Sequence, residues 1–302
     1  MLSFLILSLF LAGAFVAILV SLALTLSKAK IELPASCPDR LLEARARQAR
    51  AAGRAAPGAA PPEAAPSARR RLAVCAGDSI THGVVSVNYV EMLEKRLPEW
   101  EFSNAGVNSE LAYNLVSRLD GIIALEPDVV TVLIGTNDVN ATFGLRSVLG
   151  YYALHRLPER PNILFYRENL TLIARRLRSE TRARVAFLSI PPLGEDDRHY
   201  AFLRTEEYAR VVAEVAAAEG VAYLPLRERL VSYLESVPKG SPIPFAHFSR
   251  AQNSSVRSHI LLGKSFDEIS ASNGFHLLVD GIHLNTHAAS VIADLVEGFI
   301  RS

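Results

Sequence analysis

From residue 71 to the end of the chain, short apolar runs alternate with segments whose apolar residues recur at helical spacing. The apolar runs predict strands at 71–77, 101–107, 128–135, 184–190 and 221–226. The segments between them predict helices at 88–97, 111–125, 167–181, 205–219 and 286–300. Apolar strands separated by amphipathic helices are typical of a parallel sheet with helices on both faces. The pattern therefore predicts one α/β domain over residues 71–302.

The first 27 residues follow a different pattern, because no charged side chain precedes Lys28. As a helix this segment would span about 40 Å, more than the hydrocarbon core of a bilayer at about 30 Å. A cleavable signal peptide is the alternative, but it usually has a basic start and an apolar core of about 7–15 residues. We expect an uncleaved, single-pass transmembrane helix at 1–27 that anchors the chain in a membrane; a buried core helix is the weakest interpretation.

Residues 28–70 form an Ala/Pro/Arg-rich linker with too few bulky apolar residues to pack a core. Residues 28–71 hold ten basic and four acidic side chains, a net charge of +6, whereas residues 72–302 carry −5. The overall net charge of +1 hides this asymmetry. The basic residues either contact anionic lipid headgroups or belong to a solvated tether. Because the basic part lies beside the predicted span, we expect no nucleic-acid partner.

The sequence leaves the side of the membrane open. Basic residues directly after the span favour a cytoplasmic domain under the positive-inside rule. Three Asn-x-Ser/Thr sequons, at Asn140, Asn169 and Asn253, would instead suit a lumenal domain.

The chain has two cysteines, which exclude a disulfide-rich scaffold and a four-cysteine zinc site. Cys75 lies in the first predicted strand, where we expect a small core residue and no disulfide with Cys37. No set of His, Cys, Asp and Glu has metal-ligand spacing, so we expect no metal and no other cofactor.

Polar motifs follow three predicted strands and precede the last predicted helix. They are Gly-Asp-Ser-Ile-Thr at 77–81, Asn-Ala-Gly-Val-Asn at 104–108, Gly-Thr-Asn-Asp at 135–138 and Asp-Gly-Ile-His at 280–283. Ligands of parallel α/β sheets bind at the carboxyl ends of the strands. The four motifs are therefore expected to form one site.

The residue types in these motifs suit nucleophilic catalysis. A serine hydroxyl such as that of Ser79 needs a base to remove its proton during attack. His283, whose side-chain pKa is ordinarily about 6.5, can be that base. Asp280, three residues earlier, can accept the second imidazole N–H and stabilise the imidazolium. We therefore predict Ser79, His283 and Asp280 as catalytic residues.

Negative charge develops on the attacked carbonyl oxygen, so hydrogen-bond donors must surround the place where the oxyanion forms. We predict three donors: the backbone N–H groups of Ser79 and Gly106 and the side-chain amide of Asn137. A glycine at position 106 would let the main chain approach the substrate closely.

The four motifs resemble those of the SGNH hydrolases, also called GDSL-type esterases and lipases. Ser79, Gly106, Asn137 and His283 match the four residues that name the family, in the same order, and the resemblance covers about residues 71–300. Ile80 stands where the family name has Leu. The motif is not the Gly-x-Ser-x-Gly elbow of α/β-hydrolases, because position 81 is Thr. The resemblance implies a three-layer α/β/α, flavodoxin-like fold with a five-stranded parallel sheet, and ester or thioester hydrolysis through an acyl-serine.

Other polar residues near the motifs are expected to have structural roles. Asp78 should accept hydrogen bonds from local backbone N–H groups, and Asn108 and Asp138 should brace loops. The histidines outside the motifs are likewise expected to be structural: His82, His276 and His287.

Two long stretches, 141–166 and 235–273, exceed the minimal fold and are expected to shape the substrate pocket. The first is apolar and aromatic enough to line an acyl pocket or to form a satellite core. The leading hypothesis is a membrane-tethered carboxylic ester hydrolase acting on a lipid, or on an acylated or acetylated small molecule or glycan. An acyltransferase using the same acyl-serine is the alternative enzyme, and a non-catalytic binding module is the alternative of another class. The sequence makes no prediction of the oligomeric state.

Overall fold

The computed structural model describes residues 70–302. The predicted membrane span at 1–27, and the predicted linker up to residue 69, lie outside this part of the chain, so the predicted domain boundaries stay predictions. None of the helices within residues 70–302 is long and apolar enough to cross a bilayer.

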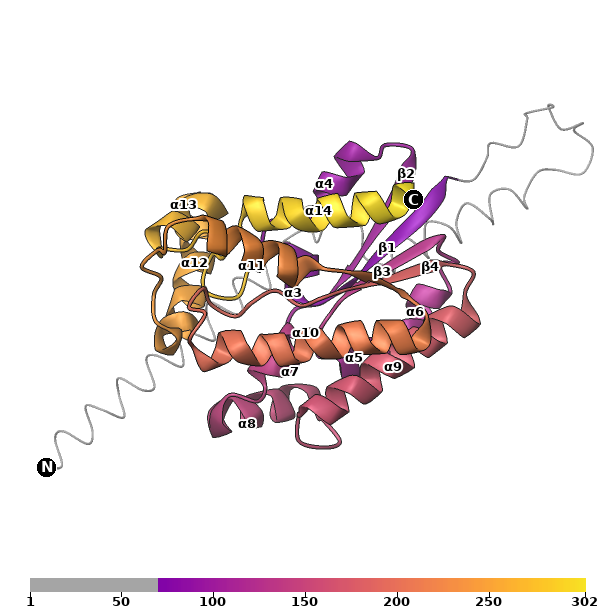
Figure 1. Ribbon diagram of the computed structural model, residues 1–302, viewed down its shortest axis with the longest axis horizontal. Coiled ribbons are helices and arrows are strands. Elements are labelled where there is room, and N and C mark those ends of the chain that lie inside the picture. The colour runs from indigo at the N-terminus through magenta and orange to yellow at the C-terminus, as the bar shows by residue number, and fades with distance from the viewer. Residues whose placement is uncertain (1–69) are drawn as a thin grey trace, which may run out of the picture. The chain divides into compact units, whose positions relative to one another are not determined.

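Five parallel strands form a single sheet in the order β2-β1-β3-β4-β5 (Figure 1). The strands are β1 (Arg71–Gly77), β2 (Trp100–Gly106), β3 (Val129–Leu133), β4 (Arg184–Leu188) and β5 (Ala222–Leu224). Every residue of the central strand β3 is buried, which agrees with its continuous apolar run. The predicted five-stranded parallel sheet is confirmed.

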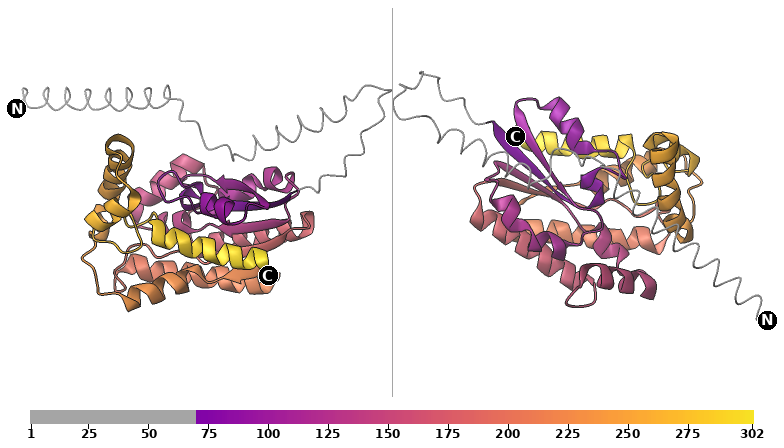
Figure 2. Two further views of the ribbon diagram at one scale, coloured as in Figure 1. Left: turned by 90° about the horizontal axis from the view of Figure 1, so that it is seen from above. Right: turned by 180° about the vertical axis from the view of Figure 1, so that it is seen from behind.

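Helices cover both faces of the sheet, which makes the domain a three-layer α/β/α sandwich (Figures 1 and 2). One face carries α4 (Tyr89–Arg96), α11 (Leu226–Ser236) and α14 (Thr286–Arg301). The other carries α5 (Ala112–Ser117), α6 (Leu119–Ile123), α9 (Ile163–Glu180) and α10 (Tyr200–Glu219). Apolar side chains from the strands and from both helical layers join in one buried core.

The helix predicted at 111–125 is instead two short helices, α5 and α6, which meet at Arg118. Arg118 has a non-helical φ of −118°, and its guanidinium donates to the carbonyl oxygens of Gly77 and Ala105 at the ends of β1 and β2. These hydrogen bonds give a physical reason for the break, which apolar periodicity does not reveal.

Two other helices begin earlier than predicted, because side chains cap their first turns. The Asn162 side chain accepts from two backbone N–H groups at the start of α9, and the His199 ring accepts from the Ala201 N–H at the start of α10. The fifth strand is shorter than predicted, since it ends directly before Pro225.

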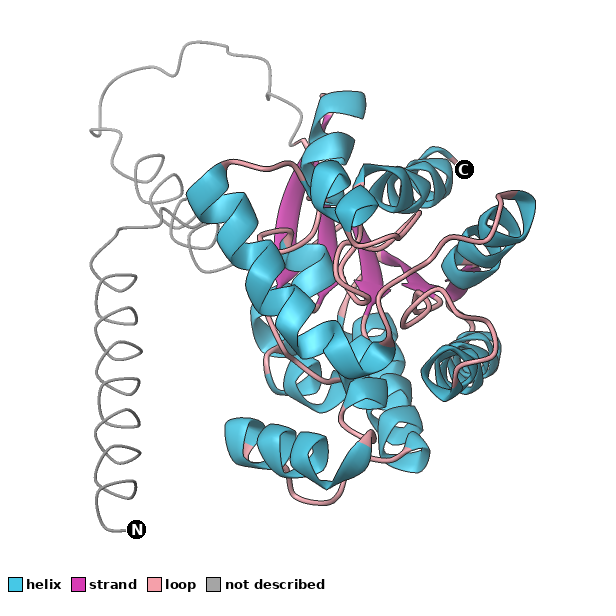
Figure 3. Cartoon of the chain, turned by 90° about the vertical axis from the view of Figure 1, so that its left-hand side faces the viewer, coloured by secondary structure: helices cyan, strands magenta, loops and turns pink. Residues whose placement is uncertain are grey.

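The loops that follow the strands gather at one end of the sheet, which faces the viewer in Figure 3. Two short helices begin there, α3 (Ser79–His82) after β1 and α7 (Thr136–Asn140) after β3. The first of the two long stretches contains α8 (Gly144–His155) and the start of α9. The second contains the 3₁₀ helix η1 (Phe245–His247), α12 (Phe248–Leu262) and α13 (Phe266–Ser272), and α12 and α13 lie at the same end of the sheet.

Candidate active site

Ser79 is the first residue of α3, directly after β1 and its cap. The Asp78 carboxylate accepts a hydrogen bond from the Ile80 N–H at 3.0 Å and so caps this helix. The turn requires glycine at position 77, because a Cβ there would lie 2.2 Å from Oγ1 of Thr81. The tight turn thus fixes the position of the Ser79 hydroxyl at the end of the sheet.

Three predicted catalytic residues form a continuous chain of hydrogen bonds. Oγ of Ser79 lies 3.0 Å from Nε2 of His283, although the two residues are 204 positions apart in sequence. Nδ1 of His283 lies 2.8 Å from Oδ2 of Asp280. The second oxygen of Asp280 accepts from the backbone N–H groups of Ile282 and His283, each at 3.0 Å. The carboxylate therefore holds both the ring and the backbone of His283.

The charges of this pair support each other. Burial alone would raise the pKa of Asp280, but the His283 charge and the hydrogen bonds to the carboxylate outweigh it, and the pKa lies below its usual value. Burial would likewise lower the pKa of His283, but the charge and hydrogen bond of Asp280 raise it above 6.5. The site therefore stabilises an imidazolium at His283, the species that a histidine base forms when it takes up a proton.

The loop that carries Asp280 and His283 is held by a residue in the loop after β4 that sequence reasoning missed. The Glu195 carboxylate accepts from the successive backbone N–H groups of residues 276, 277 and 278 at 2.8–2.9 Å. Next to it, the Gly194 N–H donates to the Gly281 carbonyl oxygen at 2.9 Å. Glu195 follows the fourth predicted strand, and this place at the carboxyl end of the sheet was the one sequence feature that could have indicated a role near the site.

Gly281 itself lies in the left-handed region, with a φ of +94°. A Cβ at this position would lie 2.4 Å from the ring of Phe248, the first residue of α12. The second long stretch therefore packs directly on the backbone between Asp280 and His283.

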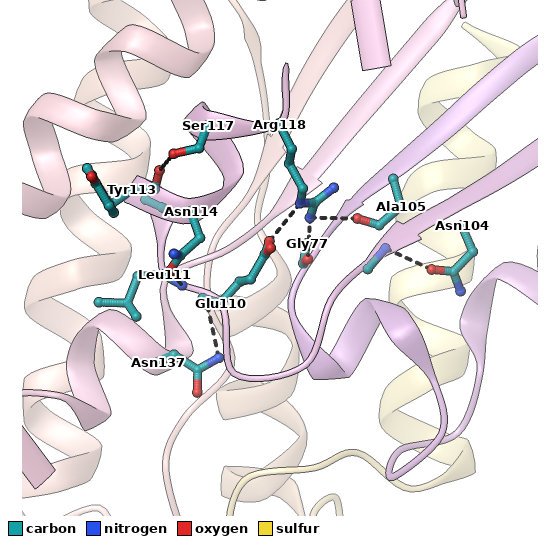
Figure 4. Close-up of polar contacts among 12 residues, drawn as sticks. Gly77, Asn104, Ala105, Glu110, Leu111, Tyr113, Asn114, Ser117, Arg118 and Asn137 are labelled. Carbon is teal, nitrogen blue, oxygen red and sulfur yellow. Dashed lines mark hydrogen bonds and ion pairs between the residues drawn. The ribbon is translucent and has the colours of Figure 1, made fainter. Parts of the chain in front are cut away.

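Asn137 lies in α7, directly after β3, and its side chain is buried at the same end of the sheet. Its Nδ2 donates to the Glu110 carbonyl oxygen at 3.1 Å, as drawn in Figure 4, and its Oδ1 accepts from the Tyr151 hydroxyl at 2.7 Å. An amide NH₂ group has two N–H donors. Within residues 70–302, the Asn137 amide donates one hydrogen bond, to the Glu110 carbonyl oxygen. Its second N–H is therefore available to a substrate oxygen.

The structure does not agree with the predicted role of the Gly106 N–H. This group donates to Oδ1 of Asn104 at 3.0 Å, so it is already engaged. Glycine is needed here for packing, because a Cβ would lie 2.2 Å from the His82 backbone nitrogen. Asn104 also donates to the Thr81 carbonyl oxygen at 2.7 Å and so joins the end of β2 to α3.

Two residues in the loop after β2 were not singled out by the sequence. Ser109 has a φ of +65°, a left-handed conformation that is uncommon for a residue other than glycine and that clusters at functional sites. Its neighbour Glu110 accepts from Nε of Arg118 at 2.7 Å, while the Glu110 carbonyl accepts from Asn137 (Figure 4). Arg118 therefore ties this loop to the ends of β1 and β2.

The remaining polar residues near the motifs take the structural contacts expected of them. Asp138 accepts from the Ala112 N–H with both oxygens, and Asn108 contacts the His82 ring. The His276 ring contacts the Pro238 carbonyl oxygen, and the His287 ring packs on Tyr233.

Two of the buried carboxyls have strongly perturbed acidity. Burial raises the pKa of Asp78 and of Asp138 to about 7 in each case. Oδ2 of Asp78 has no hydrogen-bond partner within residues 70–302. Cys75 is fully buried in β1, as expected for a core residue, and burial raises the pKa of its thiol to about 11.

The two long stretches contribute differently to the surroundings of the site. In the first, Leu157 packs with Leu111 and Ala141 in a small apolar cluster. Of the two roles expected for this stretch, an acyl pocket or a satellite core, the cluster corresponds to the satellite core. The second lines a cavity of about 720 Å³ together with the loop after β4. Ser79 and His283 are not among its lining residues, whereas Gly194 and Phe248, which contact Gly281, are.

Residues 75–253 match the model of the GDSL-like lipase/acylhydrolase family. This chain belongs to that family. Its members are ester hydrolases, so the protein is an ester hydrolase of the GDSL type. Comparison with curated protein sequences returned no match.

Solved structures of the same fold include enzymes named for two activities. The acetyl xylan esterase AlAXEase is 17% identical, with a TM-score of 0.53, over 76% of this chain and 99% of that one. A lipase/acylhydrolase from Enterococcus faecalis is 19% identical, with a TM-score of 0.51, over 76% and 95%. The acetylxylan esterase Axe2 from Geobacillus stearothermophilus is 16% identical, with a TM-score of 0.52, over 76% and 93%. At these identities the likeness is one of fold.

Proposed function

We propose that this GDSL-type hydrolase is a membrane-anchored serine esterase that works through an acyl-serine at Ser79. The observation that carries the proposal is the chain of hydrogen bonds from Ser79 through His283 to Asp280, with distances of 3.0 and 2.8 Å. A hydroxyl, a base and an orienting carboxylate in this order are the parts that nucleophilic acyl transfer requires.

In the proposed reaction, Oγ of Ser79 attacks the ester carbonyl carbon while Nε2 of His283 takes the hydroxyl proton. The tetrahedral intermediate collapses when the bond to the leaving alcohol breaks, and His283 gives its proton to that alcohol oxygen. A water molecule, activated by His283, then attacks the acyl carbon and releases the acid, and the proton returns to Ser79. Asp280 stays ionised throughout and stabilises the imidazolium.

The oxyanion is stabilised in this proposal by the Ser79 N–H and by the free N–H of Asn137. Ser79 begins α3, and the first N–H groups of a helix have no acceptor within the helix. Ser109 replaces Gly106 as the candidate second backbone donor. Its left-handed backbone lies directly before Glu110, whose carbonyl already holds Asn137, whereas the Gly106 N–H is engaged by Asn104.

The substrate class proposed is an ester of a short acyl group on a small molecule or glycan. Two of the enzymes that share the fold are named acetylxylan esterases, which supports a small acyl group. A lipid ester is the second candidate, because the uncharged segment 1–27 would hold the domain beside a bilayer. Hydrolysis rates on acetylated sugars and on lysophospholipids, measured with one preparation, separate these two classes.

The test of the catalytic assignment is the Ser79→Ala variant of the full chain. Wild-type protein should hydrolyse a short-chain aryl ester and become covalently labelled by a fluorophosphonate, and Ser79→Ala should lose both properties. Ser254→Ala, at an exposed serine of α12, is the matched control and should retain both. Turnover by Ser79→Ala at the wild-type rate would contradict the proposal.

The same preparation separates the alternatives. An acyltransferase would transfer the acyl group to an added alcohol, which analysis of the products detects. A binding module would leave the folded wild-type protein unlabelled by the fluorophosphonate. Labelling of intact and opened membranes by a probe that does not cross them tests anchoring and reports on which side the domain lies.

A further inference from the structure

Helix α8, in the first long stretch, contributes one side chain to the candidate active site. The Tyr151 hydroxyl donates to Oδ1 of Asn137 at 2.7 Å and accepts from Nδ2 of Asn140 at 3.0 Å. The hydrogen bonds thus run in one direction, from the Asn140 amide through the Tyr151 hydroxyl to the Asn137 carbonyl oxygen.

This direction matters because a side-chain amide has two nearly isosteric orientations, related by a half-turn of the terminal group. In one orientation Asn137 presents an N–H to the oxyanion. In the other it would present its oxygen, which repels a developing negative charge. A donor fixed on Oδ1 selects the first orientation, and Tyr151 is such a donor.

The surroundings hold the Tyr151 hydroxyl in this role. Its side chain is partly buried, and desolvation raises its pKa to about 12, so that it stays protonated over the working range of an esterase. The ring stacks on His155, one helical turn later, with centroids 6.1 Å apart, and packs on the small cluster formed by Leu111, Ala141 and Leu157. Contacts of the ring and hydrogen bonds of the hydroxyl therefore both fix the position of the Tyr151 side chain.

A second residue of α8 touches the same loop. The His155 imidazole, whose pKa is lowered by burial, also contacts the backbone of Ser109. The face of α8 that carries Tyr151 and His155 thus contacts Asn137 and the backbone of Ser109, the two residues besides Ser79 to which oxyanion donors are assigned.

We propose that Tyr151 is a positioning residue that holds the Asn137 amide in the orientation required for oxyanion stabilisation. The inference rests on the proposed function and deepens it, because Tyr151 itself touches no reacting atom. It gives the long stretch that contains α8 a part in the rate of the reaction, besides any part in substrate binding.

The test is steady-state kinetics of the Tyr151→Phe variant of the full chain on a short-chain aryl ester. Loss of one oxyanion donor costs about 10²–10³-fold in kcat. A donor that is present but misoriented for part of the time should cost less, about 10-fold in kcat, with KM changed by less than about twofold. Tyr152→Phe removes a hydroxyl from the next, half-exposed tyrosine of the same helix and should leave both constants at their wild-type values.

A double-mutant cycle separates positioning from a general loss of structure. If Tyr151 acts through Asn137, then Tyr151→Phe should have no further effect on kcat in an Asn137→Ala background. Equal fractional losses in both backgrounds, or wild-type kcat in Tyr151→Phe, would overturn the inference.

The Asn140→Asp variant tests the direction of the hydrogen bonds without removing the ring. A carboxylate at position 140 can only accept, so it competes with Asn137 for the Tyr151 proton and should also lower kcat. This variant decides the matter if Tyr151→Phe fails to fold; wild-type kcat in Asn140→Asp would then overturn the inference. Fluorophosphonate titration counts active sites in every variant, and a wild-type protein with neither labelling nor turnover would refute the proposed function instead.

Discussion

At the scale of single residues, the central feature is the coupling between Asp280 and His283. The carboxylate accepts from the ring at 2.8 Å and from two backbone N–H groups of its own loop. It therefore does two things at once: it selects the imidazole tautomer that leaves Nε2 free to accept from Ser79, and it raises the pKa of His283.

The pH dependence of hydrolysis tests this coupling. Hydrolysis needs neutral His283, so kcat/KM of the wild type should fall as pH drops through a midpoint above 6.5. In Asp280→Asn the charge that favours the imidazolium is lost, so the midpoint should move to lower pH and the plateau should fall about 10²–10⁴-fold. Asp294→Asn, at an exposed aspartate of α14, should reproduce the wild-type profile. An acid limb with the same midpoint in Asp280→Asn and wild type would contradict the coupling.

The candidate catalytic and oxyanion-binding residues that lie in short motifs were predictable from the sequence. The residues that position them through hydrogen bonds were not. Ser79, Asn137 and His283 follow strands or precede a helix in recognisable motifs, and topology alone brings such positions to one end of a parallel sheet. The role of the Gly106 N–H was not predictable, because the competing acceptor is the side chain of Asn104, two residues earlier. Tyr151 could not be predicted either, since its contact depends on how α8 lies against α7.

At the scale of elements, the ends of the first two strands are joined by one side chain. Arg118 donates to the carbonyl oxygens of Gly77 and Ala105 at 3.1 and 2.9 Å, and to the Glu110 carboxylate at 2.7 Å. The strands were predictable to within a few residues because fully buried parallel strands are continuous apolar runs. The break between α5 and α6 was not, because it depends on this long-range contact.

Replacement of Arg118 by Leu should weaken the joint between β1, β2 and the loop before α5. It removes the Arg118 donor from the Ala105 carbonyl and from the partly buried Glu110 carboxylate, whereas the Gly77 carbonyl still accepts from the Val107 N–H at 3.0 Å. Groups left without a donor cost about 1–3 kcal/mol each when they are fully buried. Because water reaches part of this site, we expect a loss of about 1–3 kcal/mol in the free energy of unfolding, measured by urea denaturation. Arg118→Lys should not restore the free energy of unfolding, since one ammonium group cannot donate in the several fixed directions of a guanidinium.

The control for this variant is Arg146→Leu, at an exposed arginine of α8, which should change the free energy of unfolding by less than about 0.5 kcal/mol. Equal stabilities of the Arg118→Leu and Arg146→Leu variants would show that the joint contributes nothing measurable.

At the scale of the whole molecule, two buried carboxyls make the domain's stability depend on pH. Asp78 and Asp138 have folded-state pKa values raised to about 7 by burial, against 3.8 as the ordinary value. Between these pH values the folded state binds more protons than the unfolded state, so their contribution to stability falls as pH rises. The slope is at most about 1.4 kcal/mol per pH unit for each group.

The Asp138→Asn variant should remove one of these contributions, because an amide does not titrate and can still accept from the Ala112 N–H. Relative to wild type, this variant should therefore gain stability as pH rises from about 4 to about 7, as followed by urea denaturation at several pH values. Asp120→Asn, at a strongly exposed side chain, should keep the wild-type pH dependence. A constant difference between wild type and Asp138→Asn across this range would be inconsistent with a raised pKa at position 138.

Helix α8 also bears on how the protein responds to heat. Val148 is the one residue of α8 whose side chain is buried, whereas Leu145, Leu149 and Leu154 are 57–72% exposed. Elements with few buried apolar contacts open at a lower free energy than the core around them. Since α8 carries Tyr151, whose hydroxyl we propose to orient Asn137, detachment of this one helix should lower kcat about 10-fold, as in Tyr151→Phe, while the sheet stays folded. On heating, kcat should therefore begin to fall below the temperature at which the domain melts.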